Sequence, residues 1–239
     1  MQTNMPHGFV SNSIDSRSRP MFGRAARSLR ELVRDPESTE KAFDVLFAIG
    51  RGDFERQYRR FESDPEGARL LSERPSLVEA LSDRVALTKL PEGSFGRAYL
   101  AYLDRNGFEP DGLVKVERVV RARWEKEDGL AVLDEPRSWY RDRTIVMHDL
   151  FHVLTGKDTD PPGEGALLWF TQAQLGGGAN LFLSIGATLQ LMRFRGVEWL
   201  REVRRAWREG RRARRLATLR FEELLPLPLA TVRSLARIG

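Results

Sequence analysis

The hydrophobic positions of this 239-residue chain predict helices along almost its whole length. From residue 21 onward, apolar residues recur at intervals of three and four, which is the spacing on the buried face of an amphipathic helix. Proline and glycine divide this pattern, with helix ends expected at Asp35-Pro36 and Asn106-Gly107 and helix starts at Asp64-Pro65 and Arg74-Pro75. Residues 113–120 are the one candidate strand, and they fit a helix equally well.

We therefore expect an all-α fold, built as a single compact multi-helix domain over residues 21–239. Residues 1–20 are polar and rich in Ser and Arg, which predicts a disordered tail, with a transit peptide as the alternative. No secretory signal is visible. The chain has no cysteine, so disulfides and thiolate metal sites are excluded.

The predicted helix over residues 138–155 carries the candidate chemistry. Apolar side chains cover most of its circumference and Gly156 ends it, so this helix is expected to be buried. His148 and His152 lie within about 40° of each other on one stripe, and two imidazoles at this spacing can reach one metal ion. Asp149 is the only charged residue in the second half of the helix. A buried carboxylate is costly unless it is paired, hydrogen-bonded or bound to a metal.

Glu164 is the fourth candidate ligand. Asp160 can cap a second helix and Pro161 suits its first turn, so a helical hairpin would return Glu164 to the two histidines. Two histidines and two carboxylates make a site of nitrogen and oxygen ligands that suits Zn, Mn, Fe or Mg. In the alternative interpretation, the histidines belong to the core and Glu164 is a surface acid favoured by the helix dipole.

Residues 165–192 are uncharged. Polar side chains and the glycines 176–178 interrupt this stretch, so two buried helices are a better interpretation than one membrane span. Two such helices could line an apolar tunnel that binds a lipid. Ordinary core packing is the alternative.

The net charge of +5 is concentrated in one segment. Residues 201–220 contain nine arginines and two glutamates, so this segment carries +7 and the rest of the chain −2. An arginine helix over Arg201–Arg220 could present a solvated face, contact an anionic membrane surface, or bind nucleic acid. No recognised nucleic-acid motif supports the last interpretation, so no nucleic-acid partner is expected.

His148-Asp149-x-x-His152 followed by Glu164 resembles the signature of the Coq4 family of ubiquinone-biosynthesis proteins. Further segments that resemble the family lie at residues 34–36, 90–99, 152–156 and 210–233. The likeness covers roughly residues 21–239, and the glycines 176–178 depart from the family pattern. The chain has 34 Arg and 5 Lys, which suggests a bacterial member, cytoplasmic and peripheral to the inner membrane.

The resemblance implies a divalent metal, with Zn as the first choice, held by His148, Asp149, His152 and Glu164. It also implies a polyprenyl-aromatic lipid as substrate and the removal of the C1 carboxyl of a polyprenylated hydroxybenzoate, either as a simple decarboxylation or as an oxidative one that involves oxygen. Asp149 and Glu164 are the expected catalytic residues. Other ubiquinone-biosynthesis enzymes are expected partners, and a homodimer is a further expectation.

Two other functions compete with this one. A lipid-binding scaffold that organises partner enzymes would carry a structural metal with a closed four-ligand shell, whereas three protein ligands and an open position are typical of catalysis. A hydrolase of the zincin type is disfavoured because Asp149 stands where that motif has glutamate.

Overall fold

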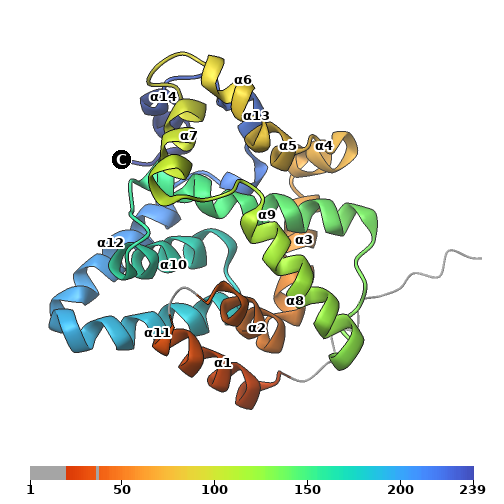
Figure 1. The fold of residues 1–239 in the computed structure, drawn as a ribbon, viewed down its shortest axis with the longest axis vertical. Helices are drawn as coiled ribbons and strands as arrows, with labels where there is room; N and C mark the ends of the chain where they lie inside the picture. The colour runs from red at the N-terminus through yellow and green to blue at the C-terminus, as the bar shows by residue number, and fades with distance from the viewer. Residues whose placement is uncertain (1–19, 36–37) are drawn as a thin grey trace, which may run out of the picture.

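The computed structural model of the protein describes residues 20–35 and 38–239 (Figure 1). Apart from Pro20, the predicted tail over residues 1–20 lies outside the described residues. The elements in chain order are α1 (Phe22–Arg34), α2 (Thr39–Ile49), α3 (Arg51–Glu62), α4 (Pro65–Glu73), α5 (Leu77–Ser82), α6 (Arg84–Lys89), α7 (Phe95–Asn106), α8 (Gly112–Asp128), α9 (Glu135–Thr155), α10 (Pro161–Leu175), α11 (Gly178–Arg195), the 3-10 helix η1 (Gly196–Glu198), α12 (Trp199–Arg212), the 3-10 helix η2 (Leu216–Thr218), α13 (Phe221–Leu224) and α14 (Leu229–Ala236).

The all-α prediction is confirmed for the described part of the chain. It contains no strand, and residues 113–120 lie within α8. An isolated bridge joins Ser94 to Pro228, and the N–H of Phe95 donates to the carbonyl of Leu227 at 2.8 Å. These contacts fix the C-terminal segment to the start of α7, and the described residues form one compact domain.

Several helix boundaries differ from the predicted ones for local reasons. Arg74 adopts a left-handed conformation at the end of α4, and Ser76 caps α5, so Pro75 precedes the helix and does not lie in its first turn. Helix α9 begins at Glu135, three residues before the predicted start, because the Asp134 side chain accepts from a backbone N–H in the first turn. The short helices α6, α13 and α14 were not predicted, since they are too brief for a periodic pattern.

Helix α9 runs through the middle of the molecule, as predicted for a helix that is apolar nearly all round (Figure 1). Its first half packs against α3, where the rings of Phe61 and Tyr140 lie 4.8 Å apart. Arg137 also binds the carboxylate of Glu55 on α3 through two hydrogen bonds of 2.9 and 3.0 Å. Its second half carries the candidate ligands. Packing of the first half of α9 in the core therefore fixes the position of the second half.

Helices α10, α11 and α12 pack together through small residues. A Cβ added at Gly210 of α12 would lie 2.7 Å from the carbonyl oxygen of Phe170 on α10, and one at Gly165 would lie 2.5 Å from Leu191. These three helices share a second, smaller hydrophobic cluster, which comprises Ala166, Leu191, Trp199, Val203 and Ala206. The close approach of α12 to α10 thus depends on glycine at position 210, because the Phe170 backbone cannot move aside as the end of the Leu191 side chain can.

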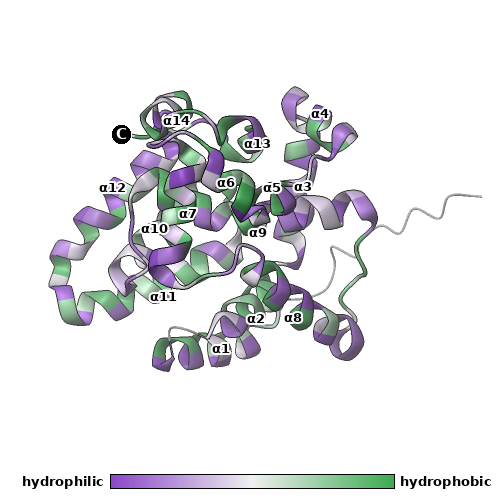
Figure 2. Cartoon of the chain, turned by 45° about the horizontal axis from the view of Figure 1, so that its top comes forward, coloured by the Kyte–Doolittle hydropathy of each residue, from purple (hydrophilic) through white to green (hydrophobic). Residues whose placement is uncertain are grey.

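Two predictions about this region are wrong in part. Helix α11 is not fully buried, because Leu181, Ile185 and Leu189 are exposed along one side. The predicted arginine helix over Arg201–Arg220 is shorter than expected, since α12 ends at Arg212. Three later arginines lie beyond α12, namely Arg214, Arg215 and Arg220, and the last two of them make ion pairs with acids near α4. Figure 2 shows hydrophobic and hydrophilic residues alternating where α11 meets α12.

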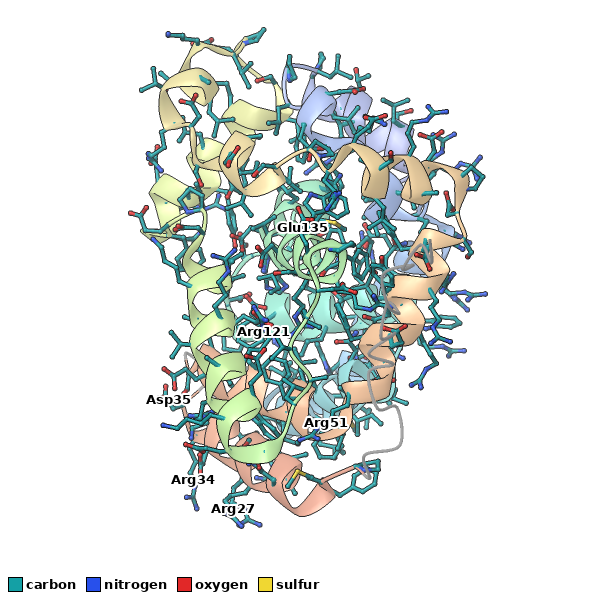
Figure 3. All side chains as sticks on the ribbon, turned by 90° about the vertical axis from the view of Figure 1, so that its right-hand side faces the viewer. Arg27, Arg34, Asp35, Arg51, Arg121 and Glu135 are labelled. Carbon is teal, nitrogen blue, oxygen red and sulfur yellow. The ribbon has the colours of Figure 1, made fainter. Side chains whose placement is uncertain are left out.

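An open hollow lies between α2, α3, α8 and α9, and it is lined by apolar side chains and arginines. Arg51 and Arg121, both labelled in Figure 3, are among its lining residues. None of the lining residues comes from the uncharged stretch 165–192, so a lipid tunnel in that stretch stays a prediction. In the described part of the chain, no helix has the length and apolar character needed to span a bilayer.

Candidate metal centre

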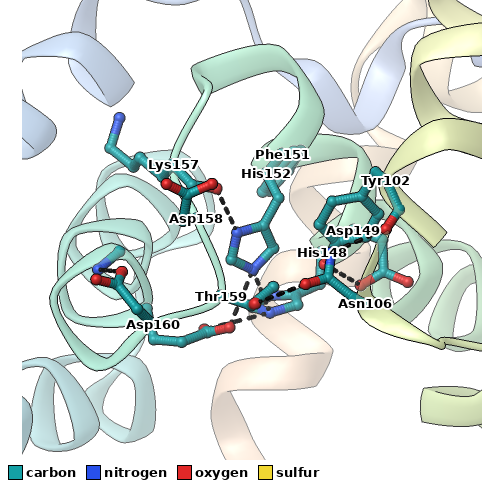
Figure 4. A network of polar contacts seen from close by, with 12 residues as sticks. Tyr102, Asn106, His148, Asp149, Phe151, His152, Lys157, Asp158, Thr159 and Asp160 are labelled. Carbon is teal, nitrogen blue, oxygen red and sulfur yellow. Dashed lines mark hydrogen bonds and ion pairs between the residues drawn. The ribbon is translucent and has the colours of Figure 1, made fainter. Parts of the chain in front are cut away.

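Three of the four predicted ligands converge where α9 meets α10. His148, His152 and Glu164 each offer a ligand atom, and these atoms lie within 4.8 Å of one another. The Nε2 atoms of the two histidines are 3.3 Å apart, and Glu164 oxygens lie 3.1 Å from His152 Nε2 and 3.6 Å from His148 Nε2. Figure 4 shows the two imidazoles from consecutive turns of α9 facing the same space. The helical spacing therefore produces the predicted pair.

His152 is oriented by two neighbours. Its Nδ1 lies 2.9 Å from the carbonyl oxygen of Lys157. A carbonyl only accepts, so Nδ1 carries the proton and the Nε2 lone pair faces His148 and Glu164. The ring of Tyr102 stacks on the imidazole at 5.6 Å between centroids, and the His152 side chain is fully buried. A metal-binding histidine is typically held in this way, with its second nitrogen bonded to a carbonyl or carboxylate.

The geometry fits a bound transition metal. Two imidazole nitrogens that bind one zinc ion at about 2.0–2.1 Å in tetrahedral geometry lie roughly 3.3 Å apart, which is the separation of the two Nε2 atoms here. Two histidines and one carboxylate also form the ligand set of non-haem iron enzymes. The His148 and Glu164 side chains are 33% and 39% exposed, so the site opens to solvent on their side. Small ligands can therefore reach it.

The turn between α9 and α10 explains how the sequence brings Glu164 to the histidines. Gly156 ends α9 in the left-handed conformation, with φ of 67°, and the Asp160 side chain caps α10 by accepting from Gly163 N–H at 2.9 Å. A Cβ added at Gly163 would lie 2.0 Å from the carbonyl oxygen of Asp158. Only glycine lets the first turn of α10 approach the loop this closely, and the next residue is Glu164.

Glu164 and His148 shift each other's pKa. Burial alone would raise the pKa of Glu164, but its hydrogen bonds with His148 and His152 outweigh burial and lower the pKa to about 2. Burial alone would lower the pKa of His148, but Glu164 favours the protonated ring and raises that pKa above its usual value. In the absence of metal, the site therefore attracts a proton in the place where a metal cation would bind.

Asp149 lies apart from the other three predicted ligands. Its Oδ1 accepts a hydrogen bond from the Tyr102 hydroxyl at 3.4 Å, and its side chain does not belong to the converging group (Figure 4). Burial is the main cause that raises the pKa of Asp149. At about 100° per residue, the Asp149 side chain points away from the stripe that His148 and His152 share. The structure thus joins Asp149 to the site through Tyr102.

Tyr102 and the carbonyl of Lys157 are parts of the site that sequence reasoning missed. Tyr102 comes from α7 and touches both His152 and Asp149. Asn106, one turn later, accepts from the Thr159 hydroxyl at 3.0 Å and so ties α7 to the α9–α10 loop. Tyr99 and Tyr102 lie about one helical turn apart, and this aromatic pair was the sequence feature that could have indicated Tyr102 as part of the site.

Comparisons with known proteins agree on one family. A family model described as coenzyme Q (ubiquinone) biosynthesis protein Coq4 matches residues 35–239. The chain is 32% identical over 216 residues to the ubiquinone biosynthesis protein COQ4 homolog, mitochondrial, of Bos taurus, a match that covers 87% of this chain and 74% of that protein. The Mus musculus protein of the same name is 31% identical over 176 residues, which cover 73% of this chain and 61% of that protein.

A crystal structure from Nostoc punctiforme resembles the fold. The two structures superpose with a TM-score of 0.61, covering 91% of this chain and 98% of that chain, at 20% sequence identity. At this identity, the likeness concerns the arrangement of the helices.

Proposed function

Because this chain belongs to the Coq4 family of coenzyme Q (ubiquinone) biosynthesis proteins, we propose that it removes the C1 carboxyl group of a polyprenylated hydroxybenzoate with the help of a bound metal. The observation that carries this proposal is the convergence of His148, His152 and Glu164 on one point that solvent can reach. Zinc is the first choice of metal, and manganese, iron and magnesium are alternatives.

The number of converging ligands favours catalysis over a purely structural metal. Three protein ligands leave a position open for a substrate oxygen, whereas structural zinc sites are closed by four. Asp149 would be the fourth ligand, but its carboxylate is bonded to Tyr102. A scaffold protein with a structural metal is the second candidate function, and a closed shell that includes Asp149 would favour it.

The roles of the residues follow from their positions. When bound, the metal supplies a Lewis acid that stabilises negative charge on the substrate. His148, His152 and Glu164 hold it, and Asp149 acts through Tyr102 to fix the His152 ring. The bond between ring carbon C1 and the carboxyl carbon breaks, CO₂ leaves, and the electron pair stays on C1. A proton from solvent at the open side then replaces the carboxyl group, so this redox-neutral step needs no oxidant.

The substrate tail and the partner enzymes are part of the same proposal. Helices α10 and α11 carry the uncharged stretch, so they are the elements that we expect to contact the polyprenyl chain. Other enzymes of ubiquinone biosynthesis are the expected protein partners, since the product must pass to the next enzyme.

Complementation of a host that lacks this step tests the function. We expect a Glu164→Ala strain to accumulate the carboxylated precursor, identified by mass spectrometry of quinone intermediates. Glu127→Ala serves as the matched control, since Glu127 is an exposed acid at the C-terminal end of α8 and has no contact with the site. Normal quinone levels in the Glu164→Ala strain would count against a catalytic metal and in favour of the scaffold.

A further inference from the structure

The corner between α11 and α12 exposes large apolar side chains at regular spacing. Phe194 is the most exposed large hydrophobic residue in the described part of the chain, at 81%, and Val197 is 67% exposed. Leu200 follows at the same interval of three, and it too is exposed. In Figure 1 this corner forms the lower left extremity of the molecule. We call residues 193–208 the α11–α12 corner.

Arginines surround these apolar side chains. Arg193 and Arg195 flank Phe194, and three more lie along α12, namely Arg204, Arg205 and Arg208. None of these five makes an ion pair with a described residue, whereas Arg201 binds Glu198 at 2.5 Å. With six arginines and two glutamates, the α11–α12 corner carries a net charge of +4. Strong positive charge therefore coincides with the most exposed apolar side chains.

We propose that the α11–α12 corner docks on an anionic lipid membrane. Apolar side chains enter the boundary between headgroups and acyl chains, while arginines extend their guanidinium groups to the lipid phosphates. A merely solvated basic face would explain the arginines but not the exposed phenylalanine between two of them. A protein partner would need acidic residues opposite these arginines, and no described feature points to such a partner.

The corner is held in place by the residues beneath it. Trp199, which follows Val197 and precedes Leu200 in the sequence, is buried although both of those residues are exposed. Gly196 makes the sharp turn between α11 and α12, with φ of 64°. Further along α11, an exposed apolar stripe extends the surface, consisting of Leu181, Ile185 and Leu189 at intervals of four. The exposed side chains thus project from ordered helices, as in interfacial membrane-binding helices.

The position of the corner connects it to the metal centre. Gly165, next to the ligand Glu164, packs against Leu191 of α11 and against Trp199, a buried residue of the corner. The corner therefore packs directly on α10, the helix that carries Glu164, and docking would bring this helix to the membrane in which a polyprenyl lipid resides. This link rests on the proposed function, whereas the docking itself does not.

Flotation with lipid vesicles tests the docking. We expect the full chain to float with vesicles of phosphatidylcholine and phosphatidylglycerol, and to bind phosphatidylcholine alone far more weakly. A Phe194→Ser/Val197→Ser variant should lose binding roughly tenfold or more, because it removes the inserted side chains. The matched control is Val85→Ser/Val132→Ser, which changes two equally exposed residues elsewhere.

Two variants that each remove two positive charges test the role of the arginines. Arg193→Gln/Arg195→Gln should weaken binding to the anionic vesicles and reduce its dependence on salt. Arg30→Gln/Arg60→Gln removes the same charge from exposed arginines of α1 and α3 that make no ion pair with a described residue, and should have a smaller effect. Circular dichroism melts confirm that each variant is folded.

Three results would overturn the proposal. They are equal binding by the Phe194→Ser/Val197→Ser variant and its control, equal binding to neutral and anionic vesicles, and a dimer of the full chain that this variant dissociates without any vesicle binding. The last result would assign the corner to a second copy of the chain. His148→Ala should bind vesicles normally, so failure of the docking and failure of the metal centre give different results.

Discussion

At the residue scale, the hydrogen bond from His152 Nδ1 to the Lys157 carbonyl decides which atoms can bind a metal. It leaves the Nε2 lone pair directed at the space shared with His148 and Glu164. The sequence was sufficient to predict this pair, since the interval of four residues fixes it. It was not sufficient to place Asp149, whose role depends on Tyr102, a residue 47 positions away in the chain. Contacts of this kind arise from tertiary packing, and the aromatic pair of Tyr99 and Tyr102 does not by itself reveal which residues Tyr102 contacts.

Removing one ligand should abolish metal binding. Changing a group that only supports a ligand typically weakens metal affinity about 10–100-fold, so Glu164→Gln and His148→Ala should each weaken it by more than roughly 100-fold. Elemental analysis of the purified proteins measures this, with Glu127→Gln as the control. Metal content that stays unchanged in His148→Ala would exclude the site.

Metal affinity should depend steeply on pH. A metal ion binds the neutral imidazole, and Glu164 raises the pKa of His148 above its usual 6.5 in the metal-free protein. Affinity should therefore fall as the pH drops through a value above 6.5. Calorimetric titration with Zn²⁺ across this range measures the midpoint, and a midpoint well below 6.5 would contradict the pairing of His148 with Glu164.

At the element scale, glycines set the distance between α10 and its neighbours. A Cβ at Gly210 would meet the Phe170 carbonyl and Ala173, whereas a Cβ at Gly23 in α1 would meet nothing within 4 Å. The sequence predicted the helices but not their close approach, because spacing along one helix does not reveal which face another helix contacts. The α9–α10 turn, by contrast, was predictable from Gly156, Asp160 and Pro161.

Gly210→Ala should destabilise the protein by about 1–3 kcal/mol, because the added methyl group separates α12 from α10. Gly23→Ala is the matched control, and it should leave the free energy of unfolding unchanged or raise it by up to about 1 kcal/mol through better helix propensity. Urea denaturation followed by circular dichroism compares them. Equal effects of the two substitutions would refute the close α10–α12 contact.

The Glu55–Arg137 pair between α3 and α9 should make stability depend on pH. Hydrogen bonds from Arg137 hold the pKa of Glu55 below its usual value. The pair therefore stabilises the fold at pH above about 4.5, and its contribution is lost as the pH falls through the lowered pKa. Glu55→Gln should cost about 1.5–3 kcal/mol at pH 7. Denaturation at pH 7 and pH 3 measures whether this difference shrinks in acid. A difference that is the same at both pH values would contradict the assignment.

At the scale of the whole molecule, one buried helix links the hydrophobic core to the candidate metal centre. Helix α9 is fixed by α3 at one end and carries both histidines at the other. Its burial was predictable from its composition. The exposure of α11 was not, because an apolar residue that faces the protein core and one that faces outward look the same in a sequence.

The central claim is that the metal held by His148, His152 and Glu164 is required to release the ring carboxyl. The most direct measurement follows labelled CO₂ from a carboxyl-labelled polyprenyl hydroxybenzoate incubated with the purified protein. We predict release by the metal-loaded protein, and a rate lower by roughly two orders of magnitude after chelation or in Glu164→Gln. Release at the same rate by the loaded, chelated and Glu164→Gln proteins would contradict the account.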